Sequence, residues 1–120
     1  MIHSDLSEKV IGAAMMVLNE LKPGLDEKIY ENALVVELQA KGFAIEQQRS
    51  FDVKYKGHQV GLLIPDLIVA GQIIVDTKVA SAFNESHVAQ MIGYLAITEM
   101  NLGLLINFKN AKLEWKRVVR

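Results

Sequence analysis

The stretch "IPDLIVAGQIIVDTK", residues 64–78, decides how the chain folds. It contains two runs of apolar and β-branched residues, which favour strands, on either side of a short segment that contains a glycine. Three charged side chains interrupt these runs: Asp66, Asp76 and Lys78. Because buried strand positions normally carry apolar residues, charges placed there need a partner or a function.

The register of the predicted hairpin decides whether the two aspartates meet. A two-residue loop would place Asp66 opposite Val75, whereas a three-residue loop, residues 70–72, would place it opposite Asp76. We favour the three-residue loop, because it is a common hairpin connection and this segment supplies a glycine for its left-handed position. Side chains alternate along a strand, so Lys78 then projects to the same face as Asp76.

Two carboxylates that face each other across a sheet repel, and burying either one alone costs on the order of several kcal/mol. A divalent cation offsets that cost, because Mg²⁺ and Mn²⁺ are bound by a few carboxylate oxygens together with water. The alternative is an ordinary salt bridge between Asp76 and Lys78, which is common on solvent-facing strands. The Pro65-Asp66 pair on the preceding strand favours the metal site.

Around this hairpin, the hydrophobic periodicity predicts three helices and five strands in the order ααβββαββ. We expect helices over residues 6–21, 26–41 and 84–100, and strands over residues 43–55, 58–69, 73–79, 102–108 and 112–119. The first three strands suit an antiparallel meander. The chain is thus predicted to be a single domain, residues 1–120, of the α/β (α+β) class with about five strands.

Composition narrows the classes of function. The formal net charge is −1, so the chain does not coat nucleic acid through a strongly basic surface, and any nucleic-acid contact is local. The absence of cysteine excludes disulfides and thiolate metal sites and suits a reducing cytoplasm. No membrane helix or secretory leader is evident, so we expect a cytoplasmic protein with no membrane partner.

Several motifs resemble those of the PD-(D/E)XK nuclease superfamily. The signature is Pro65-Asp66 followed by "DTK" at residues 76–78 on the next strand. The motif "GLDEKIY" at residues 24–30 resembles the one that names the bacterial GxxExxY proteins, a branch of that superfamily. Further similar stretches follow in the same order, namely "ENALVVELQAKGF", "HVAQMIGYL" and "LGLLINF". The resemblance therefore covers nearly the whole chain and implies a restriction-endonuclease-like core, with a mixed central sheet of about five strands flanked by helices.

The resemblance also implies roles for individual residues. Asp66, Asp76 and Glu27 match metal-binding acids, with Mg²⁺ or Mn²⁺ as the cofactor. Lys78 matches the catalytic lysine, and Gln90 matches a glutamine on the helix that follows, so Lys78, Gln90 and Asp76 are the expected catalytic residues. The chain departs from the branch in carrying Asp76 where glutamate is more common.

Several alternatives remain at this point. Glu27 also suits a helix N-terminus, where it would favour the helix dipole, and Glu31 is the second candidate for a third acid. The expected activity is hydrolysis of phosphodiester bonds, with DNA as the substrate. The rival hypothesis is a catalytically silent binding or interaction module on the same fold. A homodimer would double the surface available for nucleic acid.

Overall fold

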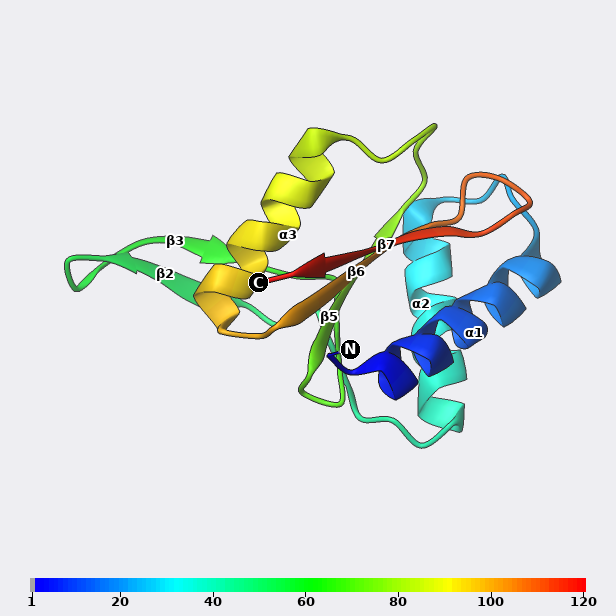
Figure 1. Cartoon of the computed structure of the whole chain (residues 1–120), viewed down its shortest axis with the longest axis horizontal. Helices are drawn as coiled ribbons and strands as arrows, with labels where there is room; N and C mark the ends of the chain where they lie inside the picture. The colour runs from blue at the N-terminus through cyan, green and yellow to red at the C-terminus, as the bar shows by residue number, and fades with distance from the viewer. Residues whose placement is uncertain (1) are drawn as a thin grey trace.

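A computed structural model describes residues 2–120. A five-stranded sheet lies between two helices on one face and a third helix on the other, and a separate two-stranded hairpin projects from this body (Figure 1). The elements are α1 (Ser4–Leu21), α2 (Glu27–Ala40), β1 (Ile45–Gln47), β2 (Phe51–Tyr55), β3 (His58–Leu63), β4 (Leu67–Val69), β5 (Ile73–Lys78), α3 (Glu85–Thr98), β6 (Leu102–Asn107) and β7 (Glu114–Val119). Within the described residues, no helix has the length and apolar character needed to cross a membrane.

The main sheet has the strand order β1-β4-β5-β6-β7. Strands β5 and β6 are parallel and are connected through α3, whereas the other neighbouring pairs are antiparallel. A parallel pair needs a long crossover, and α3 supplies it. The predicted fold class is therefore confirmed: the sheet is mixed, has five strands and is flanked by helices.

Each face of the sheet has its own hydrophobic core. On the α1 and α2 face, buried residues include Val10, Ala14, Leu34, Leu38, Val75, Leu104 and Ile106. On the α3 face the buried residues are Ile68, Ile74, Met91, Leu95, Leu105 and Val118. The alternation along β5, with Val75 on one side and Ile74 on the other, is what the period of two predicts. It also assigns Asp76 to the α3 face.

Tyr30 fixes the start of α2 against the sheet. Its ring stacks on Phe108 with a centroid separation of 4.8 Å and an interplanar angle of 5°. Its hydroxyl donates to the Lys22 carbonyl at 2.6 Å and accepts from the Leu25 amide at 3.1 Å. The connection between α1 and α2 is therefore held in place, and so is Glu27, the first residue of α2.

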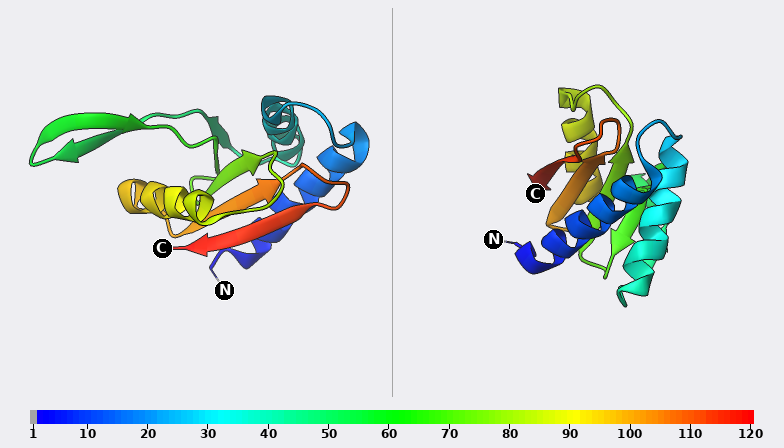
Figure 2. Two further views of the ribbon diagram at one scale, coloured as in Figure 1. Left: turned by 90° about the horizontal axis from the view of Figure 1, so that it is seen from above. Right: turned by 90° about the vertical axis from the view of Figure 1, so that its right-hand side faces the viewer.

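Two of the predicted strands are each broken in half, so the element order is ααβββββαββ. Residues 43–55 divide at Gln48, which has a left-handed backbone with φ 56°, and residues 58–69 divide at Pro65, which has no N–H to offer the ladder. Because the two breaks face each other, β2 and β3 leave the sheet together (Figure 2). The first half of residues 58–69 is consequently exposed instead of central in the sheet.

Candidate active site

The hairpin of β4 and β5 has the predicted three-residue register. Val69 pairs with Ile73, and the same alignment sets Asp66 across from Asp76 one residue before β4 begins. Both aspartates follow the parity of the α3-face residues. This register sets the two carboxyl groups side by side, and burial together with the charge of Asp76 raises the pKa of Asp66. The two acids therefore meet, as the sequence predicted.

Asp66 completes the backbone ladder where β4 has ended. Its Oδ2 accepts from the Thr77 amide at 3.0 Å and from the Thr77 hydroxyl at 3.2 Å. These bonds occupy the edge of β5 that an additional β4 residue would otherwise pair with. The side chain is thereby held next to Asp76 instead of extending into solvent.

Lys78 joins the aspartates to α3. Its Nζ lies 2.9 Å from Asp76 Oδ2, and both side chains are largely shielded, with 17% and 6% of their surface exposed. The same Nζ lies 3.5 Å from Gln90 Oε1. Helix α3 begins with a capping box between Asn84 and His87, so His87 has a structural role and the start of the helix is fixed. Three of the expected residues, Asp76, Lys78 and Gln90, are therefore in one contact network.

Glu27 lies at the border of this network. Its Oε1 accepts from the Val79 amide at 3.2 Å, directly after Lys78, so the glutamate is held at the end of β5. Across residues 2–120, however, no three histidine, aspartate or glutamate side chains converge as a ready group of metal ligands. Glu27 as a third metal ligand stays a prediction.

Glu31 is the better buried acid on α2, with 2% of its surface exposed. Its Oε2 accepts from Lys28 Nζ at 3.0 Å, from Gln47 Nε2 at 2.7 Å and from Gln48 Nε2 at 3.0 Å. The Gln48 amide also lies 3.4 Å from Asp66 Oδ1. Gln48 therefore links Glu31 to the aspartate pair.

The sequence pattern did not indicate this role for Gln48. Gln48 alternates with the apolar side chains of the strand predicted over residues 43–55, so it was expected to face solvent. Nothing in the local sequence shows that the strand breaks there. The fold sets Gln48 beside a distant segment, because its main-chain N–H donates to the Asp66 carbonyl at 3.0 Å. The sequence did not indicate a role for Thr77 either. Its side chain follows the opposite parity to the two aspartates, but its N–H and hydroxyl donate to Asp66 at the edge of β5.

Two carboxyl groups of the site, Asp66 and Glu27, hold their protons more tightly than usual. Burial is the main cause that raises the pKa of Asp66 to about 7, and the charge and hydrogen bond of Asp76 add to it. Burial and then the charge of Asp66 raise the pKa of Glu27. Tyr94, one turn after Gln90 on α3, has its pKa raised by burial and by the charges of Asp76 and Asp66. The site thus concentrates negative charge that calls for a cation.

Lys78 stays protonated at neutral pH. Burial is the largest single influence and lowers its pKa, but the hydrogen bond and charge of Asp76, followed by the charges of Glu27 and Asp66, together raise the pKa above the usual lysine value. A lysine in this state donates hydrogen bonds and supplies positive charge, and it cannot accept a proton from water. The raised pKa therefore favours an electrostatic role for Lys78 over the role of a general base.

The raised pKa of Asp66 predicts that metal-free protein loses stability as the pH rises. The pKa of Asp66 is 3.8 in the unfolded chain and about 7 in the fold. Between these pH values the folded protein binds one more proton than the unfolded chain, so its stability falls as the pH rises across this window. With allowance for solvent screening, we expect a loss of about 1–2 kcal/mol. Melting temperatures of the wild type and Asp66→Asn, recorded in EDTA from pH 4 to pH 8, measure it. The variant should lack this part of the decline, and parallel curves for the two proteins would contradict the prediction.

Comparisons with known proteins give a match to a family and two likenesses of fold. A sequence model described as the PD-(D/E)XK nuclease superfamily matches residues 4–118. No curated protein sequence matches the chain. The crystal structure of SSO0001 is similar with a TM-score of 0.59 and 14% identity, covering 78% of this chain and 49% of that one, so the chain spans about half the length of SSO0001. An alkaline exonuclease (LHK-Exo) from Laribacter hongkongensis has a TM-score of 0.53 and 12% identity, covering 89% of this chain and 76% of that one. Both likenesses concern the fold.

Proposed function

The chain belongs to the PD-(D/E)XK nuclease superfamily, and from this premise we propose that it is a metal-dependent nuclease that hydrolyses phosphodiester bonds in DNA. The observation that carries the proposal is the contact network of Asp66, Asp76 and Lys78 on one face of the sheet. The similarity to the fold of an alkaline exonuclease supports it. Membership of the GxxExxY branch, which rests on residues 24–30, is part of the proposal.

The donor set suits a Mg²⁺ or Mn²⁺ ion. Asp66 and Asp76 present carboxylate oxygens side by side, and Mg²⁺ is commonly bound by one or two carboxylates together with water and substrate phosphate. The raised pKa of Asp66 indicates that its charge is poorly compensated by the protein alone. When bound, the ion would polarise the phosphate and make water a stronger nucleophile. Glu27 would add negative charge at the border of the site.

The remaining steps fall to this chain's own side chains. Lys78 donates to an oxygen of the phosphate and stabilises the negative charge that develops as water adds and the bond to the leaving oxygen breaks. Asp76 keeps the Lys78 ammonium in position through its contact at 2.9 Å. Gln90, from α3, contacts the Lys78 ammonium through its Oε1. Its side-chain amide can also orient the attacking water. Tyr94 keeps its proton, because burial and the charges of Asp76 and Asp66 raise the pKa of its hydroxyl.

The rival function, a binding module without turnover, has one observation in its favour. Among the described residues, no buried side-chain nitrogen or oxygen lacks a hydrogen-bond partner, so the polar network is satisfied without a ligand. A site used only for structure would look the same in this respect. Dimerisation, which would enlarge the surface for nucleic acid, stays a prediction.

Replacing Lys78 tests the proposed function. We expect Lys78→Met to reduce Mn²⁺-dependent cleavage of plasmid DNA by on the order of 10²-fold, because the charge that stabilises the transition state is removed. Lys9→Met, which changes an exposed lysine of α1, is the matched control and should cleave like the wild type. Equal cleavage by all three proteins, or cleavage that persists in EDTA, would assign the signal to a contaminant.

A further inference from the structure

The two-stranded arm that leaves the sheet begins and ends at the candidate active site. This arm, residues 49–64, contains β2 and β3 and follows directly after Gln48, whose amide contacts both Glu31 and Asp66. Pro65 and Asp66 come directly after it. A molecule bound at the aspartates therefore lies next to the root of the arm. The candidate site accounts for Gln48 and Asp66 but not for the arm between them.

The root of the arm is fixed to the body, so its direction relative to the site is defined. Phe51 packs against the hydrophobic core on the α3 face. The guanidinium of Arg49 lies over the Phe51 ring, 4.6 Å from its centroid. Farther out, Gln59 Nε2 donates to Asp52 Oδ1 at 3.1 Å and ties the two strands together. Figure 1 and the left view of Figure 2 show the arm extending past α3 and away from the sheet.

The charge of the arm is opposite to that of the rest of the chain. The arm carries three basic residues, Arg49, Lys54 and Lys56, and one acid, Asp52, whereas the rest of the chain carries ten basic and thirteen acidic residues. Lys54 and Lys56 lie toward the tip and are exposed. Tyr55 between them is 64% exposed, and Lys56 Nζ lies 5.5 Å from its ring centroid. Exposed lysines beside an aromatic ring are typical of surfaces that contact nucleic-acid backbones.

The length of the arm matches a stretch of duplex. Six strand residues at about 3.3 Å each give a reach of about 20 Å, which corresponds to about six base pairs at 3.4 Å per pair. Phosphate contacts of this kind position a substrate without reading its sequence. Basic residues on the arm would also offset the repulsion between DNA and a chain whose net charge is −1.

We propose that the arm contacts the phosphate backbone of duplex DNA about six base pairs from the bond that is cleaved. This inference rests on the proposed function, because it names how the same site recognises its substrate. A second copy of the chain is the competing occupant, since Val60 and Leu62 are 63% and 58% exposed. The charges favour DNA, because two arms packed together would bring their lysines into repulsion.

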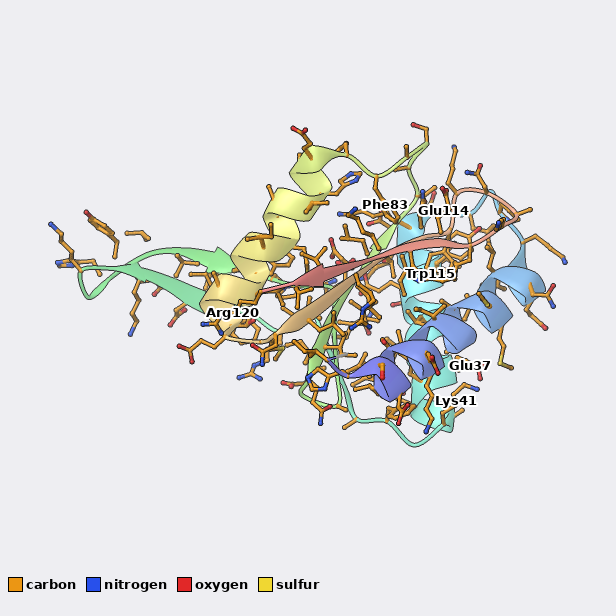
Figure 3. All side chains as sticks on the ribbon, in the orientation of Figure 1. Glu37, Lys41, Phe83, Glu114, Trp115 and Arg120 are labelled. Atoms are coloured by element: carbon orange, nitrogen blue, oxygen red, sulfur yellow. The ribbon has the colours of Figure 1, made fainter. Side chains whose placement is uncertain are left out.

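Duplex binding by the double variant Lys54→Gln, Lys56→Gln tests the proposal. Both this variant and its control are made in the Asp76→Asn background, so that binding is measured without cleavage. The control is Lys9→Gln, Lys41→Gln, which removes the same charge from α1 and from the end of α2; Figure 3 shows Lys41 far from the arm. We expect the arm variant to bind a duplex with 12-base-pair flanks on the order of tenfold more weakly, with a log Kd against log salt slope reduced by about one to two. The control should change neither quantity.

Two further measurements separate the possible failures. On a duplex with flanks of only four base pairs, which the tip cannot reach, the arm variant should bind like its background. Equal affinity and slope for the arm variant and the control on long duplexes would overturn the proposal, even if wild-type cleavage stands. If the wild type does not cleave DNA but the arm variant still has a reduced slope of log Kd against log salt, the proposed nuclease activity is wrong and the proposed role of the arm stands. A dimer seen by sedimentation that dissociates in Leu62→Lys, with no change in duplex affinity, would assign the arm to a second copy.

Discussion

Asp76→Asn is expected to lower metal-dependent DNA cleavage by about 10³-fold, equivalent to about 4 kcal/mol in the barrier. The substitution keeps the shape of the side chain but removes one of the two charges that would hold the metal. It also removes the anion that keeps Lys78 Nζ in place at 2.9 Å. Initial rates of plasmid nicking in Mg²⁺ and in Mn²⁺ provide the measurement. Asp5→Asn, an exposed aspartate on α1, is the matched control and should retain full activity.

The same variant separates a catalytic from a structural role for Asp76. Because the charge of Asp76 raises the pKa of Asp66, removing it relieves repulsion between the two carboxyl groups. This relief opposes the loss of the ion pair with Lys78, so we expect metal-free Asp76→Asn to melt within about 3 °C of the wild type, while its cleavage is lost. A fall of several degrees in melting temperature, with cleavage reduced only in proportion to the folded fraction, would show that Asp76 serves the fold alone.

Glu31→Ala is expected to have the largest effect on stability among substitutions at polar residues. Glu31 is 2% exposed and accepts three hydrogen bonds, so its removal leaves a cavity and deprives the Gln47 and Gln48 side-chain amides of one acceptor each. Breaking a buried polar network of this kind costs about 3 kcal/mol, which lowers the melting temperature by about 10–15 °C in a domain of this size. Differential scanning calorimetry in EDTA measures the change without interference from metal binding.

Glu37→Ala is the matched control for this prediction. Glu37 lies on the same helix, closer to its end, and pairs only with Lys41 at 3.4 Å with both side chains partly exposed (Figure 3). Such a pair contributes at most about 0.5 kcal/mol, so the control should melt within about 3 °C of the wild type. If Glu31→Ala melts no lower than Glu37→Ala, the network around Glu31 is not the structural support that its contacts indicate.

The local part of the site could be predicted from the sequence because strand alternation and hairpin loop length are short-range rules. Alternation placed Asp76 and Lys78 on the same face of the sheet, and the loop at residues 70–72 placed Asp66 opposite Asp76. The five-stranded mixed sheet was expected from the resemblance to the PD-(D/E)XK nuclease superfamily, and α3 supplies the crossover that the parallel pair of β5 and β6 needs. These inferences needed no knowledge of contacts between distant residues.

The departure of the arm from the sheet could not be predicted in the same way. It depends on two breaks that face each other, at Gln48 and at Pro65, and only the second has a signature in the sequence. The bridge from Gln48 to Glu31 and Asp66 joins three segments that are far apart in the chain, so neither periodicity nor spacing could indicate it. Likewise, Glu31 could only be offered as an alternative to Glu27, because burial distinguishes them and burial follows from the complete fold.

The central claim is that Asp66 and Asp76 share a divalent cation beside the Lys78 ammonium. The most direct measurement is an anomalous difference map from crystals of the wild type grown with Mn²⁺, with crystals of Asp66→Asn treated alike for comparison. The account predicts a peak within coordination distance of both aspartate carboxyl groups, and its loss in the variant. A wild-type map without such a peak, at a Mn²⁺ concentration that supports cleavage, would contradict it, as would a peak bound by other residues.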